Sequence, residues 1–208
     1  MAERNRDTLL NEVADYYSAK LKDHGMTAKG VDWSSADSQI LRFEQLLRIL
    51  REDEEFSLND LGCGYGALLR HLQPKYPRFS YMGVDVSEAM IAAASRDAPA
   101  HAAFHLGSEP PAVADYSVAS GIFNVRLSQS ESDWAAYMHA TVDVLDRSSS
   151  KGFAFNCLTS YSDSDKMRPD LHYADPCYWF DLCKRKYSRN VALLHDYGLY
   201  EFTILVRK

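Results

Sequence analysis

The chain has 208 residues, of which 46% are hydrophobic and 25% charged, and its formal net charge is -6. This length suits one domain with its own core, and the composition is that of an ordinary soluble globular protein. The acidic balance disfavours nucleic-acid and anionic-membrane partners, because phosphate binding needs a basic surface. No apolar run reaches membrane-spanning length, and the charged N-terminus lacks the apolar stretch of a secretory signal.

Cysteine usage indicates the compartment. The four cysteines are scattered and form no C-x-x-C pair: Cys63, Cys157, Cys177 and Cys183. This spacing predicts free thiols in a reducing cytoplasm rather than a disulfide framework or a zinc site.

The first quarter of the chain is predicted to be helical. A helix is expected over 7–23, and a second over 37–51 with an apolar face of Ile40, Phe43, Leu47 and Leu50. The acidic run "REDEE" (51–55) is interpreted as a solvated helix end or loop.

Strands and helices then alternate. Strands are expected at 56–61, 79–85, 101–106, 115–123, 152–158, 189–197 and 199–208, the last two joined by a tight turn at Gly198. Helices are expected at 66–76, 87–97, 130–147 and near 177–187, and a loop-rich stretch at 159–176. Ser87 is the expected N-cap of the second of these helices, and a capping box from Ser130 to Asp133 opens the third.

This alternation predicts an α/β fold. We expect a seven-stranded, mostly parallel sheet with helices on both faces. The short link at Gly198 predicts an antiparallel C-terminal hairpin. Residues 1–54 are interpreted as an N-terminal helical lid and residues 55–208 as the domain proper.

The stretch "NDLGCGYG" (59–66) follows the first strand, where ligands of such sheets bind. Gly62, Gly64 and Ala67 also satisfy the dinucleotide pattern G-x-G-x-x-G/A, and Asp85 lies 19 positions after Gly66. Little chain remains for a nicotinamide enzyme's catalytic domain, and Asp60 has no role in that pattern. Asp60 suits a cofactor that carries an ammonium group.

With these motifs, residues 55–208 resemble a class I S-adenosylmethionine-dependent methyltransferase. "DLGCGYG" resembles the first motif of that family and "GVDVS" the second. The resemblance implies these S-adenosylmethionine-binding residues: Asp60, Gly62, Cys63, Gly64, Gly66, Asp85, Val86, Met90 and Ser108. Glu109 is an alternative to Ser108, because the aspartate that the family often has there is missing. Asn59 replaces an apolar residue, and we favour a structural role for it.

The resemblance also places the residues after the fourth strand beside the transferring methyl group. This implies Asn124 as the residue that orients the acceptor. His195, at the end of the sixth predicted strand, is interpreted as a candidate general base, with a half-buried strand histidine as the alternative. Arg42 is assigned to the cofactor carboxylate, against the alternative of a solvated arginine. The expected acceptor-binding residues are Tyr17, Trp33, Phe123, Arg126, Tyr161 and Tyr173, several of them in an aromatic lid.

We find no metal-ligand spacing, and Asp170, His172 and Asp175 are interpreted as a polar surface loop. The leading hypothesis is a metal-independent, cytoplasmic methyltransferase acting on oxygen or nitrogen of a small molecule. The alternatives are a methyltransferase acting on protein or tRNA, a non-catalytic S-adenosylmethionine-binding module, and a nicotinamide oxidoreductase.

Overall fold

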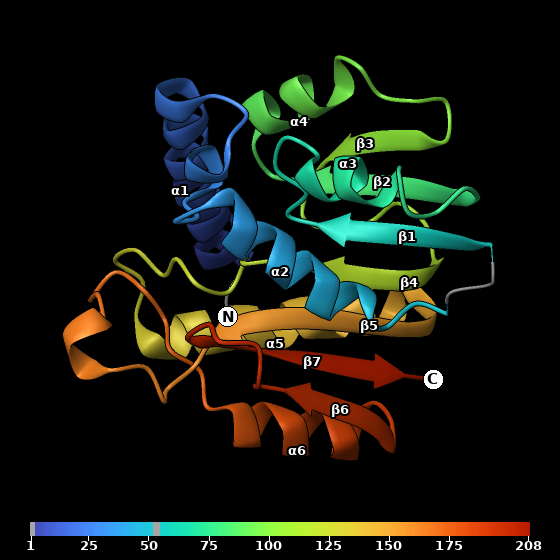
Figure 1. Ribbon diagram of the computed structural model, residues 1–208. Coiled ribbons are helices and arrows are strands. Elements are labelled where there is room, and N and C mark those ends of the chain that lie inside the picture. Colours follow the sequence, from blue (N-terminus) through green and yellow to red (C-terminus); the bar gives the residue numbers. More distant parts are fainter. Residues whose placement is uncertain (1–2, 52–54) are drawn as a thin grey trace.

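The structure, a computed structural model, describes residues 3–51 and 55–208 (Figure 1). Its strands form one sheet in the order β3-β2-β1-β4-β5-β7-β6. The strands are β1 Phe56–Leu61, β2 Phe79–Asp85, β3 Ala102–Leu106, β4 Ala114–Ala119, β5 Ser149–Leu158, β6 Asn190–Leu194 and β7 Glu201–Arg207. β7 pairs antiparallel with both β5 and β6, while β1 to β5 pair in parallel. The predicted seven-stranded mixed sheet is confirmed.

The helices follow the predicted order with some different ends. They are α1 Glu3–His24, α2 Ala36–Leu47, α3 Ala67–Leu72, α4 Glu88–Ser95, α5 Glu131–Arg147 and α6 Pro176–Lys186, with short 3-10 turns η1 Ala28–Val31 and η2 Ser164–Lys166. The predicted caps are confirmed, because Ser87 accepts from Met90 N and Ser130 from Asp133 N. Residues 52–54 of the acidic run lie outside the described residues. Within the described chain, none of these helices combines the length and apolar character that crossing a membrane requires.

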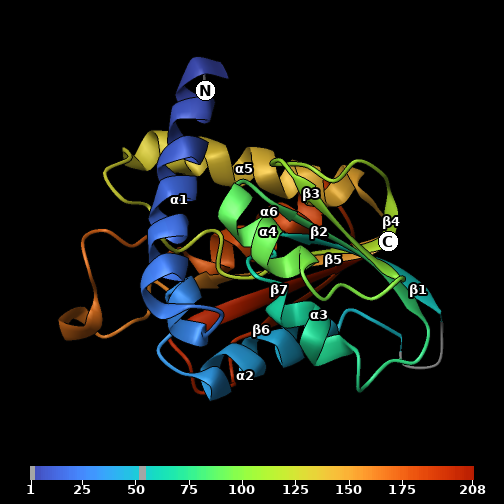
Figure 2. The same ribbon diagram turned by 90° about the horizontal axis from the view of Figure 1, so that it is seen from above.

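Apolar side chains pack on both faces of the sheet, as alternation along β5 shows. Phe153, Phe155 and Cys157 point into a cluster with α5 and α6, whereas Ala154 points into a cluster with α2 and α3. Viewed from above, α5 lies on one side of the sheet and α2 and α3 on the other (Figure 2). The central strands are therefore covered on both faces, as near-continuous apolar strands require.

The helices of the N-terminal segment lie in two different places relative to the sheet. α1 and η1 lie beside the carboxyl edge of the parallel strands (Figure 1), whereas α2 buries Phe43, Leu46 and Leu47 against the sheet. Ile40 is 41% exposed, so the apolar face of α2 differs from the predicted one. Within the segment interpreted as a lid, α2 therefore packs on a face of the sheet, and α1 and η1 lie at its carboxyl edge.

Two strands end earlier than predicted. β4 stops at Ala119, and Gly121 then takes a left-handed φ of 77° that an extended strand does not allow. β6 stops at Leu194, so His195 lies in the exposed connection to β7. Residues at both positions are therefore carried by loops.

Asn59, the polar residue inside β1, joins three parts of the core. Its Nδ2 donates to Ala112 O and to Ser148 O, both at 3.0 Å, and the side chain is buried. These carbonyls precede β4 and β5, so the amide connects the central strand to the entry of its neighbours. The preference for a structural role is confirmed.

Asn59→Leu should lower the free energy of unfolding by about 1–3 kcal/mol, because Ala112 O and the buried Ser148 O each lose a donor. Urea denaturation followed by circular dichroism measures this loss. Binding at the glycine loop should be unchanged, because Asn59 does not line the pocket described below. Unchanged stability with lost ligand binding would contradict the structural role.

Candidate active site

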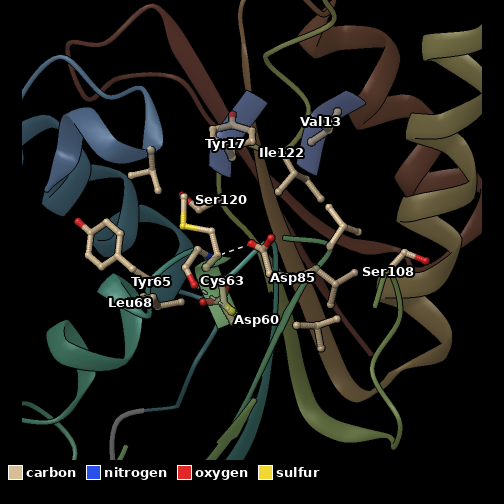
Figure 3. Close-up of a pocket in the computed structure, with 18 of the residues that line it drawn as sticks. Val13, Tyr17, Asp60, Cys63, Tyr65, Leu68, Asp85, Ser108, Ser120 and Ile122 are labelled. Atoms are coloured by element: carbon tan, nitrogen blue, oxygen red, sulfur yellow. Dashed lines mark hydrogen bonds between the residues drawn. The ribbon is translucent and has the colours of Figure 1, made fainter. Parts of the chain in front are cut away.

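A pocket opens at the carboxyl ends of β1, β2 and β4, where the glycine loop begins. In Figure 3, Asp60, Cys63 and Asp85 lie together at its centre, Tyr17 and Val13 point in from α1, and Ser108 lies on the side away from Tyr65. Among the described residues that line it, the charged ones are Arg6, Asp60 and Asp85. The rest of the lining is apolar, aromatic or neutral polar, which suits a largely organic ligand.

Three glycines shape the loop at the pocket floor. Gly62, Gly64 and Gly66 have φ angles of 72°, 54° and 81°, in the left-handed region that favours glycine. A side-chain carbon on Gly62 would lie 2.1 Å from Ile122 Cγ2. One on Gly64 would lie 3.1 Å from Val31 Cγ1. Both the backbone conformation and the lack of space therefore require glycine at Gly62.

Asp85, the last residue of β2, fixes this loop. Its Oδ2 accepts from Gly64 N and its Oδ1 from Ser87 N, both at 2.9 Å. Burial raises the pKa of the Asp85 carboxyl, and these backbone hydrogen bonds oppose the rise. Each carboxylate oxygen keeps a lone pair for a further donor, such as a ligand hydroxyl.

Asp60 is the second buried acid of the pocket. Tyr81 OH donates to its Oδ2 at 2.5 Å, and the residue is 2% exposed. Burial raises the pKa of Asp60 to about 7, the Tyr81 hydrogen bond opposes this, and the nearby Asp85 adds to it. The carboxyl group would therefore favour a positively charged ligand group, which would stabilise its ionised form.

One side of α1 forms a wall of the pocket. Arg6, Leu10, Val13 and Tyr17 line it, at the spacing of one helical face. Arg6 Nη2 donates to Ser108 Oγ at 3.3 Å and to Glu109 Oε1 at 3.2 Å. These contacts join the start of α1 to the loop after β3, so α1 covers the β3 end of the pocket.

At the other end, Trp33 is held between two groups. The Arg42 guanidinium lies 4.0 Å from the centre of the indole ring, and the ring also leaves no room for a side chain on Gly121. Arg42 in turn donates from Nε and Nη2 to Glu201 at 2.8 and 2.7 Å. This buried pair joins α2 to the first residue of β7 and positions Trp33 at the pocket.

Most of the predicted cofactor residues meet in this pocket. Its lining includes Asp60, Gly62, Cys63, Gly64, Asp85, Val86, Met90 and Ser108. Gly66 lies outside the lining and forms the left-handed N-cap of α3. Arg42 also lies outside it, because Glu201 and Ser38 O take its donors.

The predicted acceptor residues divide into two groups. Tyr17 and Trp33 line the pocket. Phe123 is fully buried in the core beside α5, and Arg126 donates to Gln129 O and Pro169 O in neighbouring loops. Tyr161 is 66% exposed, and Tyr173 accepts from Arg168 N. Of the aromatic residues predicted to bind the acceptor, Tyr17 and Trp33 line the pocket, and Phe123, Tyr161 and Tyr173 do not.

The two predicted catalytic residues also lie outside the pocket lining. Asn124 is buried, and its Oδ1 accepts from Leu158 N at 3.0 Å, which ties the loop after β4 to the end of β5. His195 is in the exposed β6–β7 connection, with its ring 5.9 Å from that of Tyr161. Because β4 ends at Ala119, Ser120, Gly121 and Ile122 take the place at the pocket that was expected for Asn124.

Sequence reasoning missed several lining residues: Arg6, Leu10, Val13, Val31, Gln39, Tyr65, Ser120, Gly121, Ile122, Tyr137 and Thr141. The stripe on α1 has a readable helical spacing. Tyr137 and Thr141 lie on α5 among core residues such as Trp134 and Met138, and nothing in the sequence distinguishes a pocket wall from core.

Gly62→Ala should lower the free energy of unfolding by about 2–4 kcal/mol, through left-handed strain and the clash with Ile122. In an Ile122→Ala background the same change should cost less, because only the strain remains. Chemical denaturation of the four proteins in this double-mutant cycle measures the difference. Strictly additive losses would contradict the close contact.

Comparison with known proteins agrees with this architecture. A family model described as a methyltransferase domain matches residues 59–147. A Mycobacterium tuberculosis protein, named "Putative methyltransferase Rv1506c", is 58% identical over 164 residues, which cover 78% of this chain and 99% of that protein.

Solved structures share the fold at low sequence identity. A complex described as DhpI-SAM-HEP has a TM-score of 0.64 and 15% identity, covering 96% of this chain and 98% of that one. Human N-acetylserotonin methyltransferase in complex with SAM has a TM-score of 0.57 and 16% identity. That match covers 80% of this chain, which spans about half (51%) of the human chain.

The identity to the mycobacterial relative, the strand order and the glycine loop followed by Asp85 all agree. The chain therefore belongs to the class I methyltransferases, the family that uses S-adenosylmethionine as its methyl donor.

Proposed function

We propose that this methyltransferase acts on an oxygen or nitrogen of a small-molecule acceptor, without a metal ion, in the cytoplasm. The observation that carries the proposal is the closure of the pocket by α1, η1 and Trp33, with few charges in its lining. An acceptor that reaches the glycine loop has to fit among Tyr17, Trp33 and Ile122. A small, mostly apolar molecule suits this space better than a folded RNA or protein surface.

The residues of the pocket fit S-adenosylmethionine. The left-handed glycines 62 and 64 expose bare backbone, and Asp85 has lone pairs for ribose hydroxyls. Val86, Met90 and Gly107 provide an apolar place for the adenine, with Ser108 beside it. Asp60 would attract the ammonium group. When bound, the cofactor supplies an electrophilic methyl group on a positively charged sulfur.

The chain's own contribution is orientation and exclusion of water. Its described pocket lining contains no histidine, lysine or glutamate. Burial raises the pKa of Tyr17, so this hydroxyl stays protonated and can donate to the acceptor. The carboxylates in the described lining, those of Asp60 and Asp85, would be taken by the ammonium group and the ribose, so the pocket favours acceptors that react without prior loss of a proton.

Two observations support the proposed metal independence and the proposed cytoplasmic location. In residues 3–51 and 55–208, no three His, Cys, Asp or Glu side chains come together as metal ligands would. All four cysteines are free thiols, three of them buried, as is usual in a reducing cytoplasm.

An acceptor screen tests the function. The purified protein is incubated with methyl-labelled S-adenosylmethionine and EDTA, and with pooled small metabolites, bulk tRNA or cell protein in parallel. We expect label only in the small-molecule fraction, and mass spectrometry then identifies the acceptor. Label in tRNA or protein, or activity that EDTA abolishes, would contradict the proposal.

The affinity for S-adenosylhomocysteine, the demethylated product, should rise with pH. Its ammonium group prefers the ionised form of Asp60, whose pKa burial raises to about 7. Binding should be roughly tenfold weaker at pH 6 than at pH 7.5 and level off above neutrality, because the ionised fraction follows this pKa. The pKa of Asp60 is raised in the free protein, and binding of the ammonium group favours the ionised carboxylate. Ligand binding below pH 7 therefore releases a proton.

Isothermal titration in buffers of different ionisation enthalpy measures both the affinity and the released proton. Asp60→Asn is the control and should lose most of the pH dependence. Any remainder reports on Asp85, whose pKa burial also raises. Equal pH dependence in the variant and the wild type would exclude Asp60 as the titrating group.

A further inference from the structure

Two buried polar groups near the carboxyl ends of β4 and β5 have no hydrogen-bond partner in the described part of the chain, and a third, Arg6 Nε, lies at the α1 wall of the pocket. The first two are Ser120 Oγ and Asn156 Nδ2. Asn156 is fully buried, and Ser120 lines the pocket. Buried polar atoms of folded proteins nearly always have a partner, so an unpaired pair next to a cavity indicates a ligand or water.

The backbone brings the two groups to the same place. β4 and β5 are parallel neighbours, with Ala119 opposite Phe155, and Ser120 and Asn156 are the next residues on each chain. Asn156 Oδ1 accepts from Gly121 N at 2.7 Å. This bond sets the orientation of the amide, so its other end is a donor.

The charges around the pocket indicate what these groups would bind. Asp60 and Asp85 are acids, and Arg6 approaches at the opposite end, near Ser108. Arg42 donates from Nε and Nη2 of its guanidinium group to Glu201. A ligand oxygen that settles near the ends of β4 and β5 therefore meets uncharged donors, the hydroxyl of Ser120 and the amide of Asn156.

We propose that Ser120 Oγ and Asn156 Nδ2 form a donor pair that binds a hydrogen-bond-accepting oxygen of a ligand. This inference rests on the proposed function. The oxygen comes either from the carboxylate of the cofactor's methionine portion or from a hydroxyl or carbonyl of the acceptor. Asn156 is not itself a lining residue, but its amide is bonded to Gly121 N, and Gly121 lines the pocket. The other unpaired amide, Asn124, is bonded through its oxygen to Leu158 N instead and is not part of this site.

The test uses two ligands that differ only in their amino-acid portion. S-adenosylhomocysteine carries the carboxylate, and 5′-methylthioadenosine lacks it. Their affinities are measured by isothermal titration for the wild type, Ser120→Ala and Asn156→Asp. The aspartate keeps the oxygen that Gly121 N needs and removes the donor.

Ser117→Ala is the matched control. Ser117 lies on the same strand, and its hydroxyl is bonded to Ser148 rather than unpaired. We expect Ser117→Ala to lower the melting temperature and leave both affinities unchanged. Ser120→Ala should show the opposite, an unchanged melting temperature and altered binding, because its hydroxyl has no partner within the protein.

If the pair binds the cofactor carboxylate, Ser120→Ala and Asn156→Asp weaken S-adenosylhomocysteine about tenfold or more, as expected for a lost bond to a charged group, and spare 5′-methylthioadenosine. If it binds the acceptor, both affinities persist. Benzyl alcohol, a neutral hydroxyl probe, then gives saturation-transfer signals with the wild-type S-adenosylhomocysteine complex and not with the Ser120→Ala complex.

Equal weakening of both nucleosides would overturn the proposal, because the substitution would then have disturbed the whole pocket. Unchanged affinities together with equal benzyl alcohol signals would overturn it too, and would leave the two groups to bound water. If the proposed small-molecule function is wrong, the acceptor screen shows label in tRNA or protein. The binding measurements with the two nucleosides can still be interpreted in that case.

Discussion

The carboxylate of Asp85 holds together the parts of the protein that form the pocket. It accepts from Gly64 in the loop after β1 and from Ser87 at the start of α4. Ser87 caps α4 and also shares a hydrogen bond with Ser18 of α1. The glycine loop, α4 and α1 are therefore linked through Asp85 and its neighbour Ser87. The pKa of Asp85 rises because desolvation outweighs its hydrogen bonds.

A second buried charge organises the other end. Arg42 and Glu201 are 159 residues apart in sequence and form a two-point ion pair. Such a pair adds little to stability compared with apolar packing, yet removing one partner typically costs about 3–5 kcal/mol, because the other charge stays buried. Its geometric effect is to hold Trp33 against Gly121. Through this pair, the position of Glu201 at the start of β7 affects the position of Trp33 in the pocket.

Together these two contacts produce a site whose own charge is mainly negative and whose walls are mainly apolar. A cofactor with an ammonium and a sulfonium group offsets the buried acids. Asp60, whose pKa burial raises to about 7, lies among the lining residues, so pH and ligand binding are coupled there. The unpaired group of Ser120 lies directly after β4, and that of Asn156 lies on the neighbouring strand β5.

Local sequence was sufficient for what depends on local physics. Periodicity and capping residues indicated the order of helices and strands. The glycines after β1 together with the acid at the end of β2 indicated the pocket floor. The ends of strands were less accessible, because the turn at Gly121 is held by Asn156 and Trp33 from distant segments. Because of that turn, Asn124 lies outside the pocket lining, whereas Ser120 and Ile122 line the pocket. Likewise, no local pattern reveals that Arg42 pairs with Glu201 or that one side of α1 covers the pocket, since packing between remote elements sets both.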